Sequence, residues 1–114
     1  MNVTIWHNPR CSKSRATLAL LHERGIEPQV RLYLDSTPDA VEISEALKLL
    51  GVPAMDLVRR GEPEFHEAGL SDISSEDDLI AAMVDFPKLI ERPVVLANGK
   101  ARMGRPPESV LEIL

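Results

Sequence analysis

The chain has 114 residues, 44% of them hydrophobic and 27% charged, which is typical of one compact domain over residues 1–114. Its formal net charge of −5 argues against non-specific nucleic-acid binding, which needs a basic surface to neutralise phosphates. No apolar run is long enough to cross a bilayer, and the first residues do not resemble a secretory signal. We therefore expect a cytoplasmic protein that binds neither nucleic acid nor a membrane.

The first third of the chain predicts a strand, a helix and a second strand. The β-rich run Val3–Trp6 is followed by a helix that Ser12 or Ser14 could cap and that Gly25 could end. The segment 29–34 then alternates between apolar and other residues, which indicates a strand. Its apolar side consists of Val30, Leu32 and Leu34. A crossover of this length favours a parallel βαβ unit.

The middle of the chain predicts helices. Thr37-Pro38-Asp39 carries the Pro and acid of a first helical turn, and Val41 and Leu47 belong to the apolar stripe that follows. A short helical turn is expected over 53–58. A longer helix is expected over 75–86, where serine and acidic residues open the segment and apolar residues recur with helical spacing.

The last part of the chain predicts a hairpin and a final helix. Two strands, 93–97 and 100–103, flank Asn98-Gly99, a strong signal for a two-residue turn. Pro106-Pro107 then opens a helix over 108–114. The order β-α-β, helices, β-β-α is that of an α/β thioredoxin-like fold with a mixed sheet and a helical insertion between its halves.

Cys11 is the only cysteine, so the chain can form no internal disulfide, and no metal site is expected. The residue follows a strand and precedes a helix, where free N–H groups and the helix dipole favour a thiolate and bind anions. Arg10, Lys13 and Arg15 add positive charge nearby. The alternative is that Cys11 is a small buried hydrophobic residue.

Four segments resemble the glutaredoxin-dependent arsenate reductase family, in that family's order and over nearly the whole chain. The segment from His7 to Arg15, HNPRCSKSR, is similar to its active-site loop. Three further segments resemble its arginine segments: Leu57-Val58-Arg59-Arg60-Gly61, Glu91-Arg92-Pro93-Val94-Val95 and Arg102-Met103-Gly104-Arg105-Pro106. The loop is a fairly specific signal, and the arginine segments are informative as a set.

The resemblance implies reduction of arsenate to arsenite through a thio-arsenate adduct on Cys11. Glutathione and glutaredoxin would resolve the adduct, with glutathione as co-substrate and no bound cofactor. His7 and Ser14 would tune or orient the Cys11 thiolate, and Pro93 would match the cis-proline of thioredoxin-like proteins. Three arginines would bind the oxyanion: Arg59, Arg92 and Arg105. Guanidinium groups suit this role, because they meet tetrahedral oxyanions with paired, charge-assisted hydrogen bonds.

Several alternatives stay open from the residues alone. Arg60 competes with Arg59 for one role, and His7 is either an exposed strand-end residue or a protonated partner of the Cys11 sulfur. A phosphatase-like arsenate reductase would carry Arg where Thr17 stands, and a dithiol oxidoreductase would carry Cys where Ser14 stands. A non-catalytic homologue with the same fold, a transcriptional regulator that binds RNA polymerase, is the alternative from another functional class.

Overall fold

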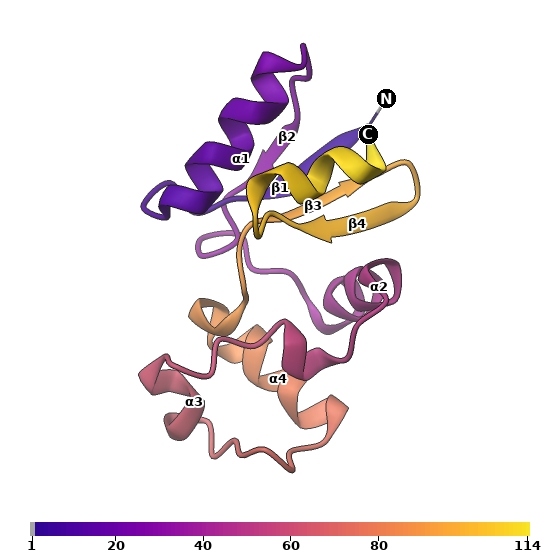
Figure 1. Ribbon diagram of the computed structural model, residues 1–114. Coiled ribbons are helices and arrows are strands. Elements are labelled where there is room, and N and C mark those ends of the chain that lie inside the picture. The colour runs from indigo at the N-terminus through magenta and orange to yellow at the C-terminus, as the bar shows by residue number, and fades with distance from the viewer. Residues whose placement is uncertain (1) are drawn as a thin grey trace. The chain divides into compact units, whose positions relative to one another are not determined.

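The computed structural model describes residues 2–114, which form two compact units (Figure 1). One unit combines residues up to Ser36 with Arg92–Leu114, and the other is Thr37–Glu91. The single domain expected over residues 1–114 stays a prediction. The first unit contains β1 (Val3–Trp6), α1 (Ser12–Glu23), β2 (Gln29–Arg31), β3 (Val94–Ala97), β4 (Lys100–Met103) and the 3-10 helix η3 (Pro107–Ile113). The second contains α2 (Ala40–Leu50), α3 (Pro63–Glu67), α4 (Glu76–Asp85) and the 3-10 helices η1 (Ala54–Asp56) and η2 (Pro87–Leu89).

The first unit is built on a four-stranded mixed sheet in the order β2-β1-β3-β4. Strand β1 runs parallel to β2 and antiparallel to β3, which pairs antiparallel with β4. Helix α1 and η3 pack together (Figure 1). Their apolar side chains form one core with alternate residues of β1 and β3. That core contains Val3, Ile5, Leu21, Val95, Ala97, Val110 and Ile113. The mixed α/β fold class predicted from the sequence is confirmed.

Strand β2 is shorter than the sequence pattern predicted, and the prediction for its apolar side was wrong. The strand ends at Arg31, because its only partner in the sheet, β1, ends opposite at Trp6. Beyond this point Tyr33 is fully buried. The three residues of the predicted apolar side are 37–43% exposed: Val30, Leu32 and Leu34. A segment at the sheet edge has one neighbouring strand, so alternation alone does not decide which side is covered.

The second unit consists of short helices, of which α4 contacts α2, η1 and η2, and α3 contacts η2. Helix α2 begins with a capping box, in which the Asp39 carboxylate accepts from the Glu42 N–H and the Glu42 carboxylate accepts from the Asp39 N–H. The helix ends at Gly51, whose φ of 71° lies in the left-handed region. The predicted apolar stripe was wrong at Val41, which is 70% exposed, and right at Leu47, which is buried.

A segment in the middle of the second unit is paired with its last residues. A bridge joins Val58 to Ile90, the Arg59 N–H donates to the Leu89 carbonyl, and the Glu91 N–H donates to the Leu57 carbonyl. This pairing holds the backbone of Arg59 beside that of Leu89 within the second unit.

We predict that Asp39→Ala lowers the free energy of unfolding by about 1 kcal/mol, because it removes the N-cap acceptor of α2. Urea unfolding followed by circular dichroism measures the effect. Glu45→Ala is the matched control, since Glu45 lies exposed within the same helix, and it should change the value by less than about 0.5 kcal/mol. Equal losses in the two variants would contradict the role of the cap.

Candidate active site

The register of the sheet brings the Cys11 loop and two of the arginine segments to the same end of the strands in the first unit. Trp6, the last residue of β1, is paired with Val94, and Val94 is paired with Met103, the last residue of β4. The loop that carries Cys11 follows β1 directly, Arg92 and Pro93 precede β3, and Gly104 and Arg105 follow β4. These three segments therefore leave the sheet beside one another.

Cys11 is the N-cap residue of α1, a position for which the sequence favoured Ser12 or Ser14. Its backbone is extended, with φ −94° and ψ 122°, and its carbonyl accepts the first helical hydrogen bond from the Arg15 N–H at 2.9 Å. The Cys11 side chain makes no capping hydrogen bond, so it leaves the N–H groups of the first turn to another acceptor. Cys11 is half-buried, so its side chain is partly accessible to solvent.

The first turn of α1 differs from those of the other α-helices. Helices α2, α3 and α4 each carry at least one acidic residue there, whereas α1 carries none. Lys13 lies in this turn, and Arg10 and Arg15 lie within one turn of it. The positive end of the α1 dipole is therefore not compensated by a local carboxylate, which suits an anion.

Ser14 holds the loop together from the inside. Its side chain is fully buried, and its Oγ lies 2.6 Å from His7 Nδ1 and accepts from the Asn8 N–H at 3.0 Å. The Asn8 side chain accepts from the Arg10 N–H, and the Asn8 carbonyl accepts from the Cys11 N–H, each at 3.0 Å. One hydroxyl thus joins the start of the loop to α1. No pattern in the sequence indicated the hydrogen bonds that Asn8 makes.

His7 fits neither of the two alternatives considered for it. The residue is 5% exposed, so it is not a solvated strand end. Burial, with a smaller contribution from the Arg15 guanidinium, lowers the pKa of His7 below its ordinary value of 6.5. The imidazole is therefore favoured in its neutral form at neutral pH. A neutral His7 paired with Ser14 acts on the loop through hydrogen bonding and not through a positive charge.

Arg92 and Arg105 are joined to each other in the first unit. The Arg105 Nε donates to the Arg92 carbonyl at 2.9 Å, and the Gly104 N–H donates to the Pro93 carbonyl at 2.9 Å. The Arg92–Pro93 peptide bond is cis, as the resemblance implied, and the Arg105–Pro106 bond is cis as well. Two of the three predicted arginines thus lie at the end of the strands from which the Cys11 loop also leaves the sheet.

Arg59 and Arg60 lie in the second unit, where each is paired with acidic side chains. The Arg59 guanidinium contacts Glu62 at 2.7 Å and Glu91 at 3.7 Å, and Arg60 pairs with Asp72. Arg59 is 25% exposed at its side chain and Arg60 is 53% exposed. These pairs do not favour one arginine over the other as an anion ligand, and Arg59 stays the residue that the resemblance selects.

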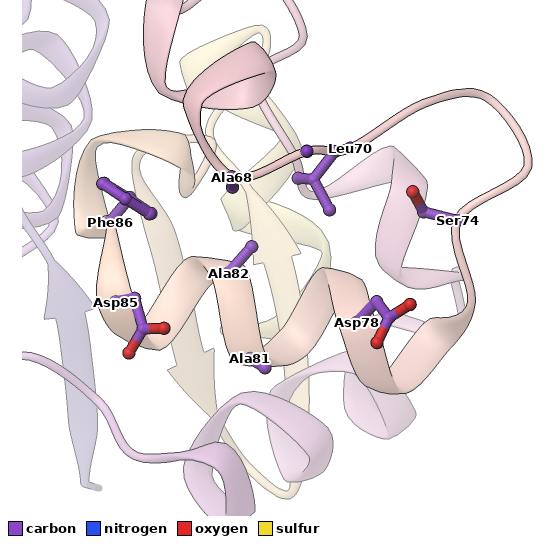
Figure 2. A pocket seen from close by; sticks show the side chains of 9 residues that line it. Ala68, Leu70, Ser74, Asp78, Ala81, Ala82, Asp85 and Phe86 are labelled. Atoms are coloured by element: carbon purple, nitrogen blue, oxygen red, sulfur yellow. The ribbon is translucent and has the colours of Figure 1, made fainter.

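The hollow that Figure 2 shows in the second unit is unsuited to an oxyanion. It has a volume of about 340 Å³ and lies against one face of α4. Its wall is apolar around Leu70, Ala82 and Phe86, and its charged side chains are the carboxylates of Asp78 and Asp85. These carboxylates repel an anion, and no cysteine lines the hollow.

The net charges of the two units also favour an anion site in the first unit and not in the second. The first unit carries nine Lys and Arg residues against five Asp and Glu residues, a formal net charge of +4. The second carries four against thirteen, a formal net charge of −9. The chain as a whole is acidic, yet the unit that contains Cys11 is basic.

Within residues 2–114, no helix is long and apolar enough to cross a membrane, and no cluster of His, Cys, Asp and Glu could hold a metal ion.

We predict that His7 titrates with a midpoint below about 6.5, measured from its ring proton by NMR. The unfolded chain then binds this proton more readily than the folded chain, so stability falls as the pH drops below that value. Arg15→Gln should raise the midpoint, yet leave it low, because burial is the larger cause. Arg24→Gln, at the far end of α1, is the control. A midpoint at or above 6.5 in the parent would contradict the neutral His7.

Comparison with known proteins agrees with this geometry. The ArsC family model matches residues 6–113. A protein of Escherichia coli K12 named "Uncharacterized protein YfgD" is 59% identical over 98% of this chain and 96% of its own length. An arsenate reductase of Neisseria meningitidis is 46% identical over 98% and 97%. The solved structure titled arsenate reductase from Vibrio cholerae has a TM-score of 0.96 and 51% identity, and covers 100% of this chain and 98% of that chain. The chain therefore belongs to the ArsC family.

Proposed function

We propose that this chain is an oxidoreductase that reduces arsenate to arsenite, with Cys11 as the nucleophile. The observation that carries the proposal is the position of Cys11 at the uncompensated N-terminus of α1. The nucleophilic sulfur and a set of free N–H groups that can bind an oxyanion would occur there together. The relatives named arsenate reductase, similar over nearly their whole length, make arsenate the substrate to test first.

The proposed reaction begins with attack of the Cys11 thiolate on pentavalent arsenic. A sulfur–arsenic bond forms, one arsenate oxygen leaves as water after protonation, and the adduct remains at the helix N-terminus. A first glutathione thiol displaces a second oxygen. Attack by a second thiol on the glutathione sulfur then forms the disulfide and leaves two electrons on arsenic. One water hydrolyses the remaining bond between arsenic and the Cys11 sulfur, which releases arsenite and regenerates the Cys11 thiol. In sum, one arsenate and two thiols yield one arsenite, one disulfide and one water.

The two electrons must come from outside the chain, because Cys11 is its only thiol. One cysteine cannot form an internal disulfide, so the oxidised product has to be a disulfide between other molecules. We propose glutathione as the co-substrate and glutaredoxin as the protein partner. No bound cofactor is required for this balance.

The surrounding side chains have separate proposed roles. Arg92, Arg105 and, from the resemblance, Arg59 stabilise the negative charge on the arsenic oxygens, which grows after attack. Ser14 and a neutral His7 fix the loop, so that the Cys11 sulfur stays at the helix end. The proposed charge stabilisation should be strongest at Arg92 and Arg105, which are linked by a hydrogen bond in the Cys11 unit.

We predict that Cys11→Ser abolishes arsenate reduction and that Arg92→Ala and Arg105→Ala each lower kcat/KM by about 30- to 1000-fold. These factors correspond to losses of about 2–4 kcal/mol for one charge-assisted contact in the transition state. The measurement couples disulfide formation to NADPH oxidation. Arg24→Ala, which removes an exposed arginine at the other end of α1, is the control and should retain parental rates. Parental rates in both Arg92→Ala and Arg105→Ala would exclude the proposed arginine roles.

We predict that sustained turnover requires added glutathione, and that glutaredoxin accelerates it, because the chain supplies only one of the thiols in the cycle. The same coupled assay is run with glutathione, with glutathione plus glutaredoxin, and with thioredoxin alone. Sustained turnover with thioredoxin alone would overturn the proposed thiol donors. A parent with no arsenate-dependent turnover under any of these conditions would favour the non-catalytic, RNA polymerase-binding alternative.

A further inference from the structure

Gly104 is buried in a space that has no room for a side chain. A Cβ atom built there would lie 2.4 Å from Thr17 Oγ1, 2.7 Å from Pro93 Cγ and 3.2 Å from Pro93 Cδ. Its φ lies outside the left-handed region, so the backbone conformation does not demand glycine. The glycine is therefore needed for close approach between the end of β4, helix α1 and Pro93.

Neither neighbour can make room easily. Thr17 is fully buried, and its hydroxyl donates to the Lys13 carbonyl at 2.8 Å, which holds its rotamer. Threonine is branched at Cβ, so rotation would replace the hydroxyl by a methyl group of similar size. Pro93 is a rigid ring, and its carbonyl accepts from the Gly104 N–H at 2.9 Å. An added methyl group must therefore move the backbone at Gly104 by about 1 Å to restore van der Waals distances.

The segment that would move carries Arg105 as its next residue. Arg105 is also tied to the Arg92 carbonyl through its Nε at 2.9 Å, so both arginines depend on the same placement. Thr17 lies six residues after Cys11 on the same helix, which acts as a rigid link between the two positions. The distance between the Cys11 end of α1 and the two arginines is thus set at the contact between Gly104 and Thr17.

We propose that Gly104 is a positioning residue for the reaction, because its missing side chain seats Arg105 and Arg92 against α1. Thr17 forms the other half of the contact. This inference rests on the proposed arsenate reduction and extends it to two residues that do not touch the substrate. Displacement of a catalytic group by about 1 Å can cost on the order of 100-fold in rate. A loss of about 10- to 100-fold in kcat/KM is the expected effect of Gly104→Ala.

The test compares Gly104→Ala with Gly61→Ala, a matched control. Gly61 also has a φ outside the left-handed region, and a Cβ there would meet nothing within 4 Å. Both variants receive the arsenate assay with glutathione and glutaredoxin, a thermal unfolding measurement, and alkylation of Cys11 by iodoacetamide. We expect the kcat/KM loss in Gly104→Ala alone, with Cys11 alkylated in both variants within about twofold of the parental rate, since the loop hydrogen bonds are unchanged.

Second-site changes separate positioning from loss of folding. Thr17→Ala removes the nearest atom and should restore part of the activity of Gly104→Ala, whereas Thr17→Val keeps the bulk and should restore none. Equal kcat/KM for Gly104→Ala and Gly61→Ala, in a parent that reduces arsenate, would overturn this inference alone. Activity lost together with folding, and not restored by Thr17→Ala, would also overturn it. A parent that does not reduce arsenate would overturn both this inference and the proposed function.

Discussion

The pairing of Trp6, Val94 and Met103 across three neighbouring strands is the constraint on which the rest of the site depends. Because this register is fixed by hydrogen bonds, the chain segments before β3 and after β1 and β4 leave the sheet at the same end of the strands. Three segments that are far apart in sequence thereby become neighbours without any side chain having to bring them together. A shift of the register by one residue would move each strand's apolar residues to the opposite face. Burial of Val3, Ile5 and their partners in the core therefore stabilises the register on which the site geometry depends.

The distribution of charge favours anion binding where these segments meet. The first unit is basic and the second strongly acidic, although the whole chain is acidic. In the basic unit, α1 follows its N-cap residue Cys11 and has no acidic residue in its first turn, whereas the α-helices of the second unit carry acids there. An N-terminus of this kind favours a negatively charged sulfur and a bound oxyanion for the same physical reason. Ser14 adds rigidity, because its hydroxyl ties His7 and Asn8 to the helix.

The sequence predicted the element order, the mixed sheet and the hairpin turn, because periodicity and turn chemistry are local properties. Asn98 and Gly99 both adopt positive φ, and Ser75 caps α4 as the serine and acidic residues predicted. The site was harder to predict, because its contacts join residues that local rules treat separately. Ser14 is a buried hydrogen-bond partner of His7, which lies seven positions earlier in the chain. The close contact at Gly104 is set by tertiary packing, and a glycine between a strand and an Arg-Pro pair was the only sign of it.

The central claim is that the nucleophile and the oxyanion site coincide at the start of α1. Its most direct test is the rate at which iodoacetamide alkylates Cys11 in the presence and absence of arsenate, with no reducing thiol added. Since Cys11 is the only thiol, the whole signal comes from that residue. The account predicts that arsenate slows alkylation in a saturable way, and that nitrate at equal ionic strength does not. Alkylation at the same rate with arsenate as with nitrate would show that the anion does not bind at Cys11, and would contradict the account.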